Sequence, residues 1–208
     1  DGMVFYALAS QGFRLGGTNQ QGIVAVPAGY ESDSIWNYEL AAKTTFMDGR
    51  LYVNATAFMI DWEDIQVSGR DPTGAFGFLG NAGAAEIQGL ELEVQSRPTD
   101  AFTYSLGASW LPKRELTKDQ ITTQVVAPGR KGDKLPFIPG FTANATAQYD
   151  WSLPVANWTA FVRGEYSYRG SSDSELAAER TRFNREQNSF DIVNLRAGVY
   201  RSDTGLNL

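Results

Sequence analysis

Apolar and polar residues alternate with a period of two along much of the chain. From Trp36 to Phe46 the even-numbered positions are mostly aromatic, aliphatic or small, and the odd-numbered positions are mostly polar. The same alternation runs over 102–110, 141–151 and 158–168. A period of two places the apolar set on one face of a β-strand and the polar set on the other. These four segments therefore predict strands with one apolar and one polar face.

Four further segments, 2–13, 51–67, 84–96 and 191–201, predict strands with a less regular pattern. The facing of 2–13 is ambiguous. Beyond Phe58 both faces of 51–67 are apolar, so the register of that strand stays open. Together the segments predict an all-β chain of about eight strands.

The connections between these strands alternate between short and long. The short ones are rich in Gly, Pro, Asp and Asn, which favour tight turns, and lie at 48–50, 98–100, 154–157 and 202–205. The long polar ones lie near 14–33, 68–80, 112–136 and 170–188. This is the layout of an antiparallel, up-and-down transmembrane β-barrel with short periplasmic turns and long extracellular loops. A soluble β-sandwich gives no reason for such alternation.

The aromatic residues support the same interpretation. Trp36 and Phe46 lie on one face of a strand, about 25 Å apart along the membrane normal for a rise of about 3.3 Å per residue and a tilt near 40°. That is the spacing of two aromatic girdles. We expect the apolar faces to meet lipid and the polar faces to surround a lumen. In a sandwich, Leu40, Leu106, Ala145 and Val162 would instead pack against a second layer.

Composition excludes several classes of function. Cysteine and histidine are absent, which removes thiolate chemistry, imidazole bases and the usual zinc ligands. A net charge of −6 argues against nucleic acid as a partner. The chain holds no apolar run long enough for a transmembrane helix. We predict no enzymatic activity and no cofactor or metal.

Several short segments, in the same order along the chain, resemble TonB-dependent outer-membrane receptors. They include Gln11–Arg14 followed by Gly16 and Gly17, Asn81–Gly83 ahead of Gln88–Glu93, and Leu135–Pro139. The resemblance implies that residues 1–208 are part of a barrel of about 22 strands, with the plug domain and the closing strands outside this piece. It also implies partners: the plug, TonB, outer-membrane lipid and lipopolysaccharide, and a small ligand such as a ferric siderophore.

The facing of the strands nominates candidate site residues. Eight polar positions are expected to line the ligand path or contact the plug: Asn37, Glu39, Lys43, Glu91, Glu93, Arg163, Glu165 and Arg169. Arg14 is expected at the start of a long extracellular loop, where ligand arrives first.

The function that follows is TonB-energised uptake of a scarce nutrient across the bacterial outer membrane. A ferric siderophore is the first expectation, with cobalamin or a glycan left open. Two alternatives remain. One is a complete eight-stranded structural or adhesive barrel, and the other is a soluble β-sandwich that binds carbohydrate.

Overall fold

The computed structural model describes most of the chain. The described residues are 2–20, 26–71, 73, 75–120, 128–155, 157–176, 186–201 and 206–207. Among them, none belongs to a helix that is long and apolar enough to cross a membrane.

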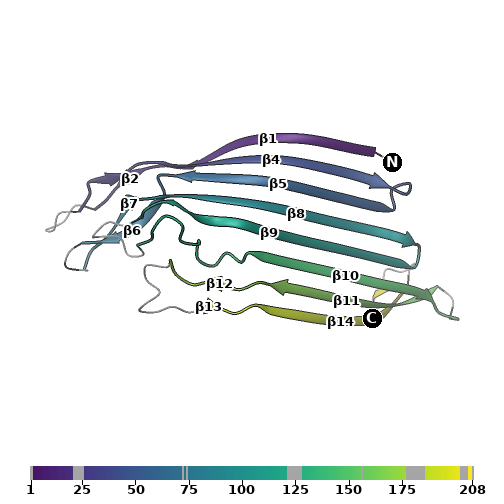
Figure 1. Ribbon diagram of the computed structural model, residues 1–208. Coiled ribbons are helices and arrows are strands. Elements are labelled where there is room, and N and C mark those ends of the chain that lie inside the picture. Colours follow the sequence, from purple (N-terminus) through teal and green to yellow (C-terminus); the bar gives the residue numbers. More distant parts are fainter. Residues whose placement is uncertain are drawn as a thin grey trace.

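One antiparallel sheet contains all the long strands of the described residues, and each strand pairs with the next one along that sheet (Figure 1). Its long strands are β1 (Gly2–Arg14), β4 (Asp33–Phe46), β5 (Leu51–Glu63), β8 (Ala84–Thr99), β9 (Phe102–Lys118), β10 (Phe141–Ser152), β11 (Trp158–Arg169) and β14 (Phe190–Arg201). The short β15 (Leu206–Asn207) pairs with the end of β14. The predicted all-β, up-and-down arrangement is confirmed.

The connections sort to the two ends of the sheet as predicted. Tight turns join β4 to β5, β8 to β9 and β10 to β11 at one end, and the long connections gather at the other (Figure 1). In the first turn Met47, Asp48 and Gly49 all have positive φ, and the Arg50 N–H donates to the Met47 carbonyl oxygen at 3.1 Å. The predicted turn at 202–205 lies outside the described residues.

Three of the long connections contain small hairpins. They pair β2 (Gly17–Thr18) with β3 (Gly29–Tyr30), β6 (Gln66–Arg70) with β7 (Gly77–Asn81), and β12 (Ser172–Asp173) with β13 (Glu186–Gln187). The segment 51–67, predicted as one strand, is therefore two. Asp64 has a φ of 52° and breaks the chain between β5 and β6.

The strand that begins at Phe102 is longer than predicted. The sequence suggested a loop from 112 onward, but β9 continues to Lys118. A register shift between Gln88 and Leu90 of β8 accommodates the extra residue on β9. Pro112 lies at this bulge, where its missing N–H breaks no ladder of hydrogen bonds.

Strand pairing settles the facings that the sequence left open, because directly opposed residues share a face. Leu40 is opposite Ala7 of β1 and Ala57 of β5, so these residues lie on the apolar face. It follows from the alternation that Phe58, Ile60 and Trp62 belong to the polar face. They lie toward the long-connection end of that face, which explains why both faces of this segment look apolar.

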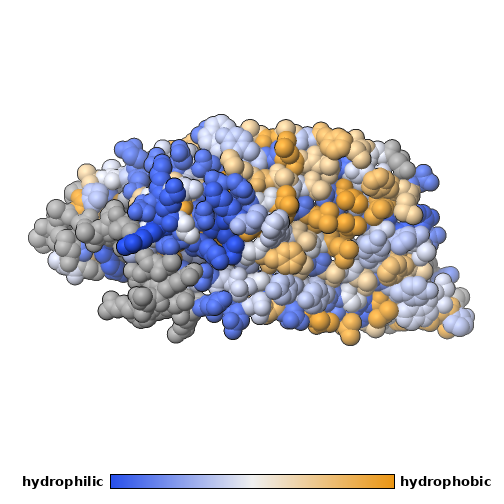
Figure 2. Space-filling model, in the orientation of Figure 1, coloured by the Kyte–Doolittle hydropathy of each residue, from blue (hydrophilic) through white to orange (hydrophobic). Residues whose placement is uncertain are grey.

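The apolar face of the sheet is the exposed one. Leu40 is 66% exposed, Leu106 46% and Val162 44%, so no second layer formed by the described residues packs on them. Apolar side chains gather over the middle and the tight-turn half of the sheet, and hydrophilic ones dominate the long-connection end (Figure 2). A face this apolar needs an apolar medium beside it. The predicted contact with lipid accounts for it, and burial in a sandwich does not.

Side chains on opposite faces of one strand test this assignment. Leu106→Arg should lower the free energy of unfolding by about 2–4 kcal/mol, because it places a charge in the middle of the apolar band. Ser105→Arg, one residue away on the polar face, should cost less than about 1 kcal/mol. The measurement is denaturant unfolding in phospholipid vesicles. Equal costs for the two variants would contradict the assignment.

A glycine on the polar face gives a second prediction. A Cβ at Gly89 would lie 2.6 Å from Phe58 Cε1 and 2.7 Å from Leu111 Cδ2. Gly89→Ala should therefore cost about 1–3 kcal/mol through overpacking. The nearest atoms to a Cβ at Gly107 belong to the end of the Asn144 side chain, which can rotate away, so Gly107→Ala is the matched control. A Gly89→Ala variant as stable as the Gly107→Ala variant would show that the Phe58 ring is not fixed there.

Candidate functional site

Hydrogen-bonded pairs of side chains line the polar face. The Arg163 Nε–H donates to Glu165 Oε1 at 2.7 Å, and the Asn37 amide donates to Glu39 Oε1 at 2.6 Å. The two members of each pair are two residues apart on one strand, so they point to the same side of the sheet. Four of the eight predicted polar-face residues are therefore held in fixed geometry by a neighbour.

Three more of the predicted residues meet in one cavity. Lys43, Glu91 and Glu93 line a hollow of about 370 Å³ on the polar face. Lys43 is opposite Asn54, which is opposite Glu93, and the Asn54 amide donates to Glu93 Oε2 at 3.3 Å. One ammonium and two carboxylates thus share a space that is suited to polar groups of either charge.

Two amide oxygens beside these charges lack partners. Asn37 Oδ1 and Asn54 Oδ1 are buried and accept no hydrogen bond from the described residues. A buried acceptor without a donor is costly. Both oxygens are therefore positions where a bound N–H or O–H group would be stabilising.

A second, basic cavity lies toward the tight-turn end of the polar face. It measures about 520 Å³, and Arg50, Arg97 and Arg163 contribute to its lining. Asp100 pairs with Arg50 at 3.5 Å and with Arg97 at 3.9 Å. Arg50 and Arg97 were missed by the sequence analysis, because they sit at strand ends within or beside predicted turns. Continuing the alternation of β8 from Glu93 and Gln95 to residue 97 would have found Arg97.

Arg169 does not join either cavity. Its guanidinium donates to the Phe137 carbonyl oxygen at 2.8 Å and so ties the end of β11 to the connection that precedes β10.

Arg14 is held at the long-connection end by a cluster that we call the rim clasp, formed by Arg14, Asp33, Trp62 and Gln66. Asp33 is only 2% exposed. Its carboxylate accepts from the Arg14 guanidinium, from Trp62 Nε1 at 3.1 Å and from the Gln66 N–H at 3.3 Å. The guanidinium also lies 5.3 Å from the centroid of the Trp62 ring, a cation–π contact.

The rim clasp also fixes the two neighbouring connections. The Gln66 side-chain amide donates to the carbonyl oxygens of Leu15 at 3.0 Å and Glu31 at 3.1 Å. Farther out, the Asn19 side chain exchanges hydrogen bonds with the backbone of Leu79 at 2.8 and 2.9 Å. The connection after β1 and the β6–β7 hairpin are thus joined through side chains. Because Arg14 serves this structure, its contact with ligand stays a prediction.

The clasp stabilises the charged form of Asp33. Hydrogen bonding to the Arg14 guanidinium is the largest cause that lowers the pKa of Asp33 from 3.8 to about 2, and the donors from Gln66 and Trp62 add to it. Asp33 lies three residues beyond Trp36, on the loop side of the apolar band. A carboxyl with a lowered pKa stabilises the fold above its ordinary pKa, and the stabilisation is lost as the pH falls toward the lowered value.

The architecture defines the class of protein. A single antiparallel sheet of long strands paired in chain order, exposed and apolar on one face and polar on the other, is what the wall of a transmembrane β-barrel looks like. The sequence matches the family described as TonB dependent receptor-like, beta-barrel over residues 1–208, and the chain belongs to that family of outer-membrane receptors. In transmembrane barrels of this kind the polar side of the strands faces the interior and the longer loops are extracellular.

Solved structures share this fold. The ferric yersiniabactin uptake receptor FyuA of Yersinia pestis has a TM-score of 0.70 at 17% identity, covering 98% of this chain and 28% of that one. BauA, the ferric preacinetobactin receptor of Acinetobacter baumannii, has a TM-score of 0.70 at 18% identity, covering 96% and 27%. The FrpB iron transporter of Neisseria meningitidis has a TM-score of 0.65 at 17% identity, covering 95% and 30%. The chain thus spans under a third of each protein.

Removing the charge of Asp33 tests the rim clasp. Asp33→Asn should reduce the protection of backbone amides in 26–32 and 66–70 against hydrogen exchange, by about 1–3 kcal/mol of local stability, because the negative charge is lost and an N–H₂ donor replaces one of the two acceptor oxygens. In the unsubstituted protein the same protection should hold above pH 3.8 and fall as the pH approaches about 2. Asp61→Asn, on the other face of the sheet, is the control. Unchanged hydrogen exchange in the Asp33→Asn variant would show that the rim clasp does not stabilise these connections.

Proposed function

We propose that this chain forms part of the barrel wall of a receptor that imports a ferric siderophore across the bacterial outer membrane, with energy supplied through TonB. The observation that carries the proposal is the family match over all 208 residues. The cargo is suggested by the structural relatives, which are described as receptors for ferric yersiniabactin and ferric preacinetobactin and as an iron transporter.

The polar face supplies the residues for this role. Lys43, Glu91 and Glu93 would contact either the plug domain or a passing ligand, since their cavity offers both charges. The paired Asn37 with Glu39 and Arg163 with Glu165 would line the same path, with Arg169 and Arg14 nearer the extracellular loops. The plug and TonB are proposed partners. Outer-membrane lipid and lipopolysaccharide would surround the apolar face.

Neither alternative function gains support. In a complete eight-stranded barrel β1 would pair with β14. Among the described residues β1 pairs with β4 alone, and β14 pairs with β11 and β15. A carbohydrate-binding sandwich would need a second sheet over Leu40 and Leu106, both of which are exposed.

Transport of radioactive iron tests the proposal. Deletion of the gene should abolish uptake of one ferric siderophore by iron-starved cells, and a plasmid copy should restore it. Uptake of the other ferric siderophores tried serves as the control, because other receptors carry them. Loss of cobalamin or glycan uptake instead would support a receptor function with a different cargo. Unchanged uptake of every ligand tried would contradict the proposal.

A further inference from the structure

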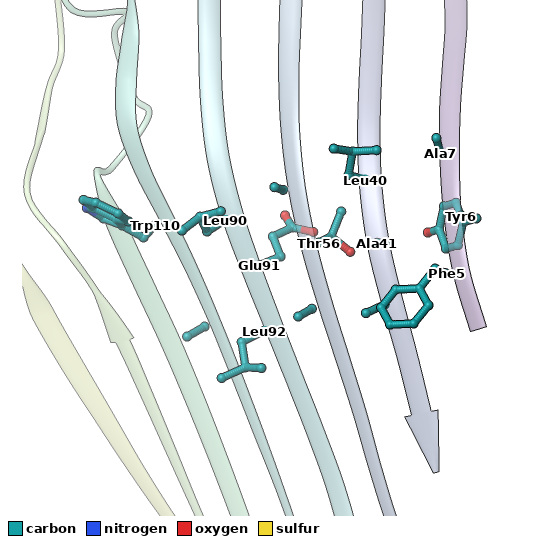
Figure 3. A pocket seen from close by; sticks show the side chains of 14 residues that line it. Phe5, Tyr6, Ala7, Leu40, Ala41, Thr56, Leu90, Glu91, Leu92 and Trp110 are labelled. Carbon is teal, nitrogen blue, oxygen red and sulfur yellow. The ribbon is translucent and has the colours of Figure 1, made fainter. Parts of the chain in front are cut away.

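The hollows on the two faces of the sheet differ in the chemistry of their lining. Leu40 and Trp110 help to line the larger hollow, on the apolar face (Figure 3). The basic cavity of about 520 Å³, on the polar face, is lined by Arg50, Arg97 and Arg163. Its remaining lining residues, within the part of the chain that the structure describes, are uncharged. The cavity therefore carries positive charge that its own lining does not neutralise.

Strand pairing places these arginines beside like charges. The Arg97 N–H donates to the Arg50 carbonyl oxygen at 2.8 Å and so continues the ladder between β5 and β8, which makes Arg50 and Arg97 neighbours across the two strands. Farther along the sheet, Arg163 of β11 is directly opposite Arg196 of β14. Like charges in opposed positions destabilise a sheet. An anion bound between the guanidinium groups would offset this repulsion.

The nearest carboxylates leave most of the guanidinium donors free. Glu165 accepts from Arg163 Nε at 2.7 Å. Asp100, whose side chain is 85% exposed, lies 3.5 Å from Arg50 and 3.9 Å from Arg97. Both distances exceed the length of about 2.7–2.9 Å that is typical of a charge-assisted hydrogen bond. Because a guanidinium has five N–H donors, the three arginines can bind further oxygen atoms.

The free donors define the class of ligand. Asp48 and Asp150 also lie toward this end of the sheet, but neither lines the cavity. Guanidinium groups are planar and bind carboxylate or phosphate oxygens in pairs. Gln95, Thr103 and Ser105 add neutral hydrogen-bonding groups to the lining. The cavity is therefore suited to an oxyanion, and not to a cation or an apolar group.

We infer that the basic cavity is an oxyanion site, which binds carboxylate or phosphate groups toward the tight-turn end of the polar face. The inference rests on the proposed function, in which that face lines the transport path. The oxyanion can come from two sources. One is a small anionic ligand that passes along the lumen, and the other is a carboxylate of the plug that stays bound there. Either source uses the guanidinium groups of Arg97 and Arg163.

The test uses the full-length receptor, purified in detergent, and tricarballylate, a small tricarboxylate, as the probe. Arg97→Gln with Arg163→Gln removes two positive charges from the cavity. Arg130→Gln with Lys131→Gln removes the same charge from an exposed turn of a long connection and is the matched control. Calorimetric titration should show binding to the native and control proteins, and binding weaker by at least about tenfold to the cavity variant. Arg97→Lys with Arg163→Lys should bind with intermediate affinity, because an ammonium keeps the charge but lacks the planar fork.

Hydrogen exchange of the same proteins identifies the source of the oxyanion. If plug carboxylates occupy the cavity, the native receptor should not bind the probe. The glutamine variant of the cavity should then exchange faster, by about tenfold or more, in an acidic peptide outside residues 1–208, and the control should not. Absence of both effects would overturn the inference. Neither measurement depends on uptake, so a receptor that imports no siderophore would contradict the proposed function and leave this test of the site unaffected.

Discussion

Every backbone N–H and C=O group that lies within hydrocarbon must find its partner inside the protein, and this constraint shapes the whole chain. Lateral pairing of successive strands, without crossover, satisfies it for the strands from β4 to β11, each of which has a neighbour on both sides. Pairing then fixes which side chains share a face, so the period of two becomes one apolar and one polar surface. The apolar surface stays exposed, without the covering layer that would bury it in a soluble protein, among the residues that the structure describes.

Above the apolar band, where water replaces lipid, the chain is held together by different interactions. Ile65, Ala85, Leu116 and Leu176 form a small buried core from widely separated segments. The rim clasp joins the neighbouring connections through a buried carboxylate. The extracellular end therefore behaves like a small globular protein built on a membrane-spanning wall. Such packing gives the described parts of the long connections a fixed shape at a place where loops are otherwise free to vary.

The sequence was sufficient to predict the wall and insufficient for the rim. Alternation is local, so strands such as 141–151 could be identified from their own residues. The pairing of Arg14 with Asp33 joins positions 19 residues apart across a loop, and nothing in the local pattern marks it. Phe58, Ile60 and Trp62 are apolar residues on the polar face, so the alternation of polar and apolar positions is lost in this part of the strand. It is lost because residues at the extracellular end pack against protein and not against lipid. Pro112 suggested a loop, because its bulge becomes visible only when β9 is paired with β8 and cannot be seen from one segment.

One face of each strand should meet lipid and the other should face the lumen. Nitroxide labels at successive positions 36–45 of β4, read by electron paramagnetic resonance in vesicles, test this assignment of the two faces. Labels at even positions should be relaxed by oxygen, which dissolves in lipid, and labels at odd positions by a water-soluble nickel complex. Even positions shielded from both reagents would mean that protein covers the apolar face, which would contradict its contact with lipid.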